Sequence, residues 1–110
     1  MAAKLRISSR DGRALAAGSP YCLVDRNTNA LISVHRSHAD AMRALVTLQQ
    51  VGSSSAALGF SAAQLHEIST SMCQRMYVGK ELDALYGAEQ SKLINAVHTE
   101  LRQRRTLESE

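Results

Sequence analysis

The amino-terminal part of the chain alternates apolar and polar residues, a pattern typical of a half-buried β-strand. The two apolar side chains of residues 4–8 fall on one face, and charged side chains fall on the other. The dipeptide Asp11-Gly12 follows and favours a tight hairpin turn. The pattern therefore predicts a first strand over 4–8 and a short return strand over 13–16.

A stronger strand signal covers residues 21–25, where apolar side chains form an almost continuous run. A polar turn at 27–29 separates this run from a second apolar run at 30–35, and asparagine suits such turns because it tolerates a left-handed backbone. The two runs predict a β-hairpin over 21–35. Within the return strand we expect Ile32 and Val34 to face the core.

A helix is predicted directly after the hairpin. Ser37 is typical of an N-cap residue, and Asp40 stands three positions later, where it can complete a capping box. Gly52 marks the end of the helix. The apolar positions recur every three or four residues and predict a stripe that covers the sheet. This stripe consists of Ala39, Met42, Leu45 and Val46.

A second helix is predicted over 62–77, because Ser61 and Gln64 form a capping-box pair just before it. Its buried stripe is expected to be Leu65, Ile68, Met72 and Met76. A short helix is predicted over 80–86, with Leu82, Leu85 and Tyr86 on one side and Gly87 as its stop.

The longest helix is predicted over 88–105. Apolar residues step along it by three and four positions and mark one continuous face. These residues are Leu93, Ile94, Val97 and Leu101. Because a chain of this size offers little core to cover such a face, a homodimer is kept open as one way of burying it.

These elements define an α+β fold. We expect an N-terminal antiparallel sheet of two to four short strands with one packed helix, followed by a C-terminal lobe of two to three helices. A length of 110 residues suits one domain. Within it, 1–51 hold the sheet and its helix, 56–107 hold the helical lobe, and 108–110 form a frayed end.

Charge is distributed unevenly along the chain, whose formal net charge is +3. Residues 1–51 hold seven basic and three acidic side chains. Arginines outnumber lysines ten to three, and a guanidinium suits bidentate contacts with phosphate or carboxylate. The chain has one Phe, three Tyr and no Trp, which is few aromatic side chains for a module that stacks on bases.

Other classes are argued against by what the sequence lacks. It has no apolar run of 18 residues for a membrane span and no apolar stretch near its start that would serve as a secretory signal. Two cysteines, Cys22 and Cys73, make no disulfide framework and are expected to be buried thiols. We therefore expect a cytoplasmic protein that does not engage a membrane.

One cluster, His35 and His38 with the nearby Asp40, has side chains suited to acid–base or metal chemistry. It supplies no third metal ligand at a recognisable spacing, and the chain has no glycine-rich phosphate loop. Pairing Cys22 with His35 across the hairpin is geometrically allowed but lacks an orienting motif. We therefore expect no enzyme, no metal and no cofactor.

Six arginines are the candidate residues for contact with a partner or a nucleic acid. Three surround the hairpin and the first long helix, and three lie at the end of the last helix, where cations also complement the helix dipole. They are Arg26, Arg36, Arg43, Arg102, Arg104 and Arg105.

Three functions remain open at this point. The first is a small non-enzymatic binding protein that docks on a larger protein or protein–nucleic acid complex as an adaptor, inhibitor or regulator, of a kind common in phages and mobile elements. The alternative is a small nucleic-acid-binding regulator, with DNA or RNA bound by the Arg-rich surface. The third is an enzyme or metal protein that uses His35, His38 and Cys22.

Overall fold

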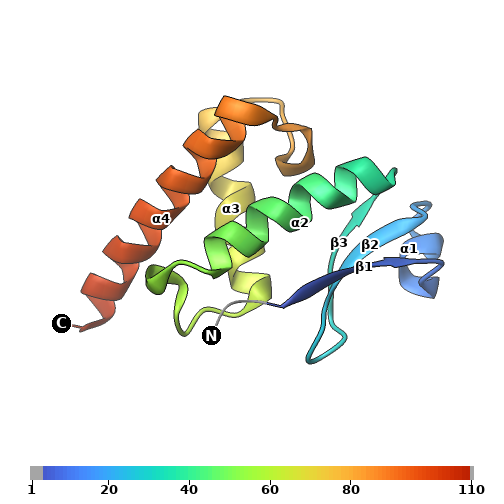
Figure 1. The fold of residues 1–110 in the computed structure, drawn as a ribbon, viewed down its shortest axis with the longest axis horizontal. Helices are drawn as coiled ribbons and strands as arrows, with labels where there is room; N and C mark the ends of the chain where they lie inside the picture. The colour runs from blue at the N-terminus through green and yellow to red at the C-terminus, as the bar shows by residue number, and fades with distance from the viewer. Residues whose placement is uncertain (1–3, 110) are drawn as a thin grey trace.

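A computed structural model describes residues 4–109, with side chains for 4–107. It shows the expected α+β fold, in which a three-stranded antiparallel sheet lies beside a helical part (Figure 1). The strands are β1 (Leu5–Ser9), β2 (Tyr21–Asp25) and β3 (Leu31–His35), in the order β1-β2-β3. The helices are α1 (Gly12–Ala16), α2 (His38–Gly52), α3 (Ala62–Met76) and α4 (Gly87–Ser109), with 3₁₀ turns η1 (Ser55–Ala57) and η2 (Leu82–Ala84).

The predicted hairpin is confirmed as β2 paired with β3. Its turn is held by Asp25, whose carboxylate accepts hydrogen bonds from the backbone N–H groups of Asn27 (2.8 Å) and Thr28 (3.2 Å). The predicted core pair on β3 is wrong in one member, because Val34 is 37% exposed. The register shifts between Leu23 and Val24, so simple alternation does not run through β3, whose buried residue is His35.

The expected return strand over 13–16 is wrong, because these residues form helix α1. Asp11 is its N-cap and accepts a hydrogen bond from the backbone N–H of Arg13 at 2.9 Å. The Arg13 guanidinium also pairs with this carboxylate and lowers the pKa of Asp11 to about 2. Alanine and leucine favour a helix once a cap is present, and Ala14 packs with Cys22 and Val24 on the face of the sheet away from the main core.

Helix α2 begins at the predicted cap, where Ser37 accepts a hydrogen bond from the backbone N–H of Asp40 at 3.1 Å. Asp40 does not complete the capping box, because its carboxylate pairs with Arg43. The predicted stripe is wrong in two members, because Ala39 and Met42 are exposed, whereas Leu45 is partly buried against the main core. The buried residues of α2 are Ala41, Ala44, Thr47, Leu48, Val51 and Gly52.

The choice of buried face follows from the position of α2, which crosses between the sheet and the other two long helices (Figure 1). Small side chains at Ala41 and Ala44 let neighbouring elements approach closely, and this close packing outweighs the burial of a longer Met42 side chain.

Helix α3 has the predicted capping box: Ser61 Oγ accepts from the N–H of Gln64, and the Gln64 side chain accepts from the N–H of Ser61. Leu65 and Ile68 are buried as expected. Met76, however, is 39% exposed, because the buried line continues through Cys73 instead.

The segment between α3 and α4 differs from the expected short helix, since only the 3₁₀ turn η2 forms there. Gly87 does not stop a helix. It has a φ of 51° and begins α4, which runs on to Ser109. The expected frayed end is therefore helical at its first two residues, and Glu110 lies outside the described residues.

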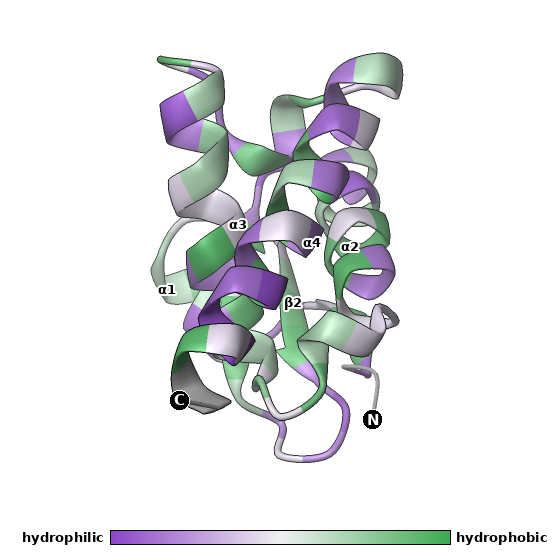
Figure 2. Ribbon diagram, turned by 90° about the vertical axis from the view of Figure 1, so that its left-hand side faces the viewer, coloured by the Kyte–Doolittle hydropathy of each residue, from purple (hydrophilic) through white to green (hydrophobic). Residues whose placement is uncertain are grey.

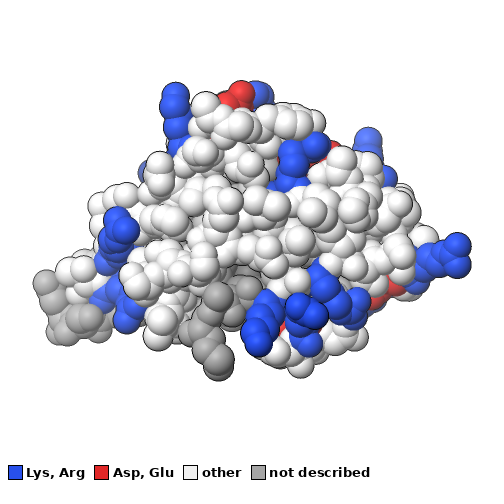
Figure 3. All heavy atoms as spheres, in the orientation of Figure 1, with Lys and Arg blue, Asp and Glu red and all other residues white. Residues whose placement is uncertain are grey.

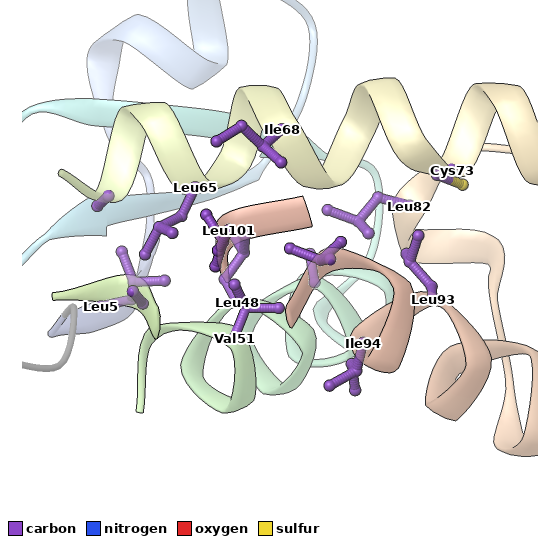
Figure 4. Packing of buried hydrophobic residues seen from close by; sticks show 14 of the residues in the cluster. Leu5, Leu48, Val51, Leu65, Ile68, Cys73, Leu82, Leu93, Ile94 and Leu101 are labelled. Atoms are coloured by element: carbon purple, nitrogen blue, oxygen red, sulfur yellow. The ribbon is translucent and has the colours of Figure 1, made fainter. Parts of the chain in front are cut away.

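The main core joins the sheet to all three long helices (Figure 4). The face of α4 that suggested a homodimer is covered by this core, since Leu93, Ile94, Val97 and Leu101 are each at most 7% exposed. Figure 2 shows β2 as a hydrophobic strand behind the helices. The argument for a dimer through this face of α4 therefore no longer holds. Among the described residues, no helix is both long and apolar enough to span a membrane.

Replacing Leu101 with alanine tests this core. Leu101 is fully buried, so L101A should lower the free energy of unfolding by about 2–5 kcal/mol. The matched control is L107A on the same helix, where the side chain is 72% exposed and the expected change is within about 0.5 kcal/mol. Urea unfolding followed by circular dichroism measures both, and equal effects would contradict the packing described here.

Candidate functional site

A hollow of about 570 Å³ lies where the end of β3, the start of α2 and the segment before α4 meet. Its lining includes apolar, basic and acidic side chains. Those on which the site depends are Val34, His35, Arg36, Arg43, Asp83 and Tyr86.

Arg43 is fixed on three sides within this hollow. Its Nε donates a hydrogen bond to the carbonyl of Asp83, and its Nη2 pairs with the carboxylate of Asp40. The guanidinium carbon lies 4.2 Å from the centroid of the Tyr86 ring, which is a cation–π contact. The guanidinium is therefore held over the ring of Tyr86, a residue that is 62% exposed.

A second set of hydrogen bonds joins α4 to the backbone of α2 at this point. Gln90 Nε2 donates to Thr47 Oγ1 at 2.7 Å and to the Arg43 carbonyl at 3.2 Å. Thr47 Oγ1 in turn donates to the same carbonyl at 2.9 Å. Because Thr47 is fully buried, these bonds satisfy polar groups inside the helix interface and set where α4 starts relative to Arg43.

The imidazole of His35 links the sheet to the segment before α4. Its Nδ1 lies 2.9 Å from Asp83 Oδ2 and its Nε2 lies 2.7 Å from Ser33 Oγ. A serine, histidine and carboxylate in this order also occur in hydrolases, where the imidazole activates the hydroxyl. Here Ser33 lies within strand β3, opposite Leu23, rather than on the sharp turn that presents such a nucleophile. The contact between His35 and Asp83 joins two segments that are 48 residues apart in the sequence.

The enzyme or metal hypothesis requires His35, His38 and Cys22 to lie together, and the structure does not bring these three side chains into one cluster. The ring of His38 packs edge-on against Tyr21, with 5.7 Å between ring centroids. Cys22 belongs to the small cluster under α1, and burial raises the pKa of its thiol. No three His, Cys, Asp or Glu side chains in the described part of the chain are placed to hold a metal ion.

The three arginines expected around the hairpin are separated by the structure. Arg36 and Arg43 both line the hollow. Arg26 follows the other end of β2, beside the hairpin turn, so a whole strand length separates it from Arg36. The predicted single cluster is therefore a pair at one end of the hairpin and a lone member at the other.

The three arginines of α4 have separate neighbours. Arg104 pairs with Glu100 at 3.1 Å, and Arg105 donates to the carbonyl of Ser55 at 2.7 Å. Arg102 is exposed. Arg104 also lines a groove of about 460 Å³ between α3 and the end of α4, together with Phe60 and Leu107.

Sequence reasoning missed Asp83 and misplaced Tyr86. Nothing local to Asp83 shows that its carboxylate meets a histidine 48 residues away. Tyr86 was expected on the same side of a short helix as Leu82 and Leu85. Because only a 3₁₀ turn forms, Leu82 and Leu85 are buried while Tyr86 projects from the surface.

A smaller cavity of about 210 Å³ lies on the other side of His35, next to α3. It is lined by His66 and Thr70, and the atoms His66 Nδ1 and Thr70 Oγ1 are buried without a hydrogen-bond partner in the described structure. Burial, and then the charge of the neighbouring His35, lower the pKa of His66 below its ordinary value of 6.5.

Comparison with protein-family models, with curated proteins and with solved structures found no match for this chain. The residues of the site are therefore the basis on which a function is inferred.

The lowered pKa of His66 predicts a loss of stability in mild acid. The folded protein holds this imidazole neutral, whereas the unfolded chain takes up a proton as the pH falls below 6.5. The free energy of unfolding should therefore fall between about pH 7 and pH 5, and H66Q should show a smaller fall. H98Q removes one imidazole from α4 and is the control. Urea unfolding across this pH range measures the effect, and identical pH dependence in H66Q and the wild type would contradict it.

Proposed function

We propose that this protein is a small non-enzymatic binding protein that docks on a larger macromolecular assembly as an adaptor, inhibitor or regulator. The observation that carries the proposal is Tyr86, a largely exposed aromatic side chain held against the fixed guanidinium of Arg43. Tyrosine and arginine, with tryptophan, are the residues most enriched among those that dominate the energy of protein interfaces.

The rigidity of this pair favours binding. Ordering a side chain on association costs about 0.5–1.5 kcal/mol, and a side chain already held by its neighbours avoids part of that cost. Arg43 is held by Asp40 and Asp83, so the face of the Tyr86 ring on which it stacks is set before a partner arrives. The exposed Val34 adds apolar surface to the same hollow.

The proposal includes the cytoplasm as the compartment in which the protein works. Both cysteines, Cys22 and Cys73, are free and buried, and burial raises the pKa of each thiol. Buried thiols of this kind support a reducing cytoplasm as the place where the protein works.

The nucleic-acid-binding regulator remains the second candidate. What favours it is a different surface, on which Lys4, Arg6 and Arg26 lie together at the β1 side of the sheet. The two candidates are compatible in an assembly that contains both protein and nucleic acid.

Substitution of Tyr86 tests the docking proposal. Affinity capture from cells of the source organism, with nuclease present, supplies a partner, and the complex is then rebuilt from purified components. Y86A should weaken its Kd by about 30-fold or more, which is the loss typical of a dominant interface tyrosine. L58A removes another apolar side chain of similar exposure, 55%, and should bind like the wild type.

Two results would contradict the proposal. One is a purified complex that Y86A binds as tightly as the wild type does. The other is a set of captured proteins that disappears entirely on nuclease treatment, which would favour the nucleic-acid candidate instead.

A further inference from the structure

Strand β1 is an edge of the sheet, and its exposed side is basic. Leu5 is 3% exposed and packs into the main core, whereas Lys4 and Arg6, one position to either side, are exposed. Alternate residues of an extended chain point to the same face, and their backbone positions are about 6.7 Å apart in an ideal strand. Lys4 and Arg6 therefore project from the same face. Figure 3 shows basic side chains gathered over this part of the molecule.

Arg26 joins this group from the neighbouring strand. Its backbone N–H donates to the carbonyl of Lys4 at 2.9 Å, which fixes the two residues side by side. Arg6 Nη2 donates to Asn29 Oδ1 at 2.7 Å, so a neutral partner from the hairpin turn holds its guanidinium. None of these three cations forms an ion pair with any described residue.

The carboxylate next to this group, that of Asp25, forms hydrogen bonds with the backbone and no ion pair with these cations. Asp25 precedes Arg26, but its Oδ1 accepts the backbone N–H groups of Asn27 and Thr28 and so closes the hairpin turn. Three exposed cations therefore lie beside one carboxylate, whose hydrogen bonds are made with the backbone. This end of the sheet carries a net positive charge.

We propose that this edge of the sheet binds the phosphodiester backbone of a nucleic acid through Lys4, Arg6 and Arg26. A row of cations on a rigid strand suits a polymer with regularly repeated negative charge, and its binding is governed by release of counterions. The group includes no aromatic side chain to stack on bases, so it contacts the backbone and does not read sequence.

This inference deepens the second candidate function, the nucleic-acid-binding regulator, and rests on it. It is independent of the docking function, which depends on other residues. The basic group lies at the hairpin-turn end of β2, whereas the hollow with Arg43 and Tyr86 lies by the opposite end, near His35. The docking function and the nucleic-acid contact can therefore be contradicted by separate experiments. The other explanation for cations on an edge strand is protection against edge-to-edge aggregation, which requires no ligand.

The test is fluorescence anisotropy with a labelled random-sequence DNA duplex of about 20 base pairs, titrated at salt concentrations from about 50 to 200 mM. Three phosphate contacts predict a slope of about −2.7 for log K against log salt. A variant carrying Lys4→Gln, Arg6→Gln and Arg26→Gln should bind at least about tenfold more weakly at the lowest salt, with a slope near zero. A duplex of another sequence should bind equally.

A matched control separates this group from the overall charge. The variant Arg75→Gln, Lys80→Gln and Lys92→Gln removes the same number of exposed cations from α3, α4 and the segment between them and should bind like the wild type. If the first triple variant fails to fold, the single change Arg6→Gln should still reduce the magnitude of the slope by about 1. Y86A should leave DNA binding unchanged, because Tyr86 lies on the other surface.

Several results would overturn the inference. Equal losses in the two triple variants would show an effect of net charge alone. Binding of polyglutamate as tightly as DNA would show general attraction to polyanions. The absence of DNA binding by the wild type at about 50 mM salt, with aggregation only in the first triple variant, would leave these cations the role of protecting the edge.

Discussion

Asp83 is the residue through which the sheet, helix α2 and the segment before α4 are joined. Its carboxylate bonds to His35 of β3, and its carbonyl accepts from Arg43 of α2. Because these contacts fix the short segment 82–86, Leu82 and Leu85 point into the core and Tyr86 points outward. The hollow at this junction has this form because Asp83 bonds to the imidazole of His35 and to the guanidinium of Arg43 at the same time.

The hairpin separates two chemically different surfaces. At one end lie Arg43 and Tyr86, whose geometry is set by acidic and backbone partners. At the other end lies the basic group of Lys4, Arg6 and Arg26, whose charges face solvent. Both faces of the sheet pack against other elements, since α1 covers Cys22 and Val24 while α2 packs on the side of Leu5 and Leu23. The two proposed surfaces therefore lie at opposite ends of the hairpin.

The parts of the fold that local chemistry dictates could be predicted from the sequence. The hairpin over 21–35 and the caps at Ser37 and Ser61 follow from turn and cap preferences that act over a few residues. The buried face of α2 could not be predicted, because it depends on which layers lie above and below that helix. Asp83 and Tyr86 of the candidate site escaped prediction for a related reason. Their roles depend on contacts with β3 and α2, far away in sequence, and no periodicity records such contacts.

A double-mutant cycle on His35 and Asp83 tests the central claim most directly. H35A, D83A and the double variant are unfolded in urea, and the Arg43 contact to the backbone carbonyl of residue 83 is chemically available in all of them. The account predicts a coupling free energy of about 1–3 kcal/mol, because either single change leaves a buried or half-buried polar group without its partner. Effects of the two changes that add to within about 0.5 kcal/mol would contradict it.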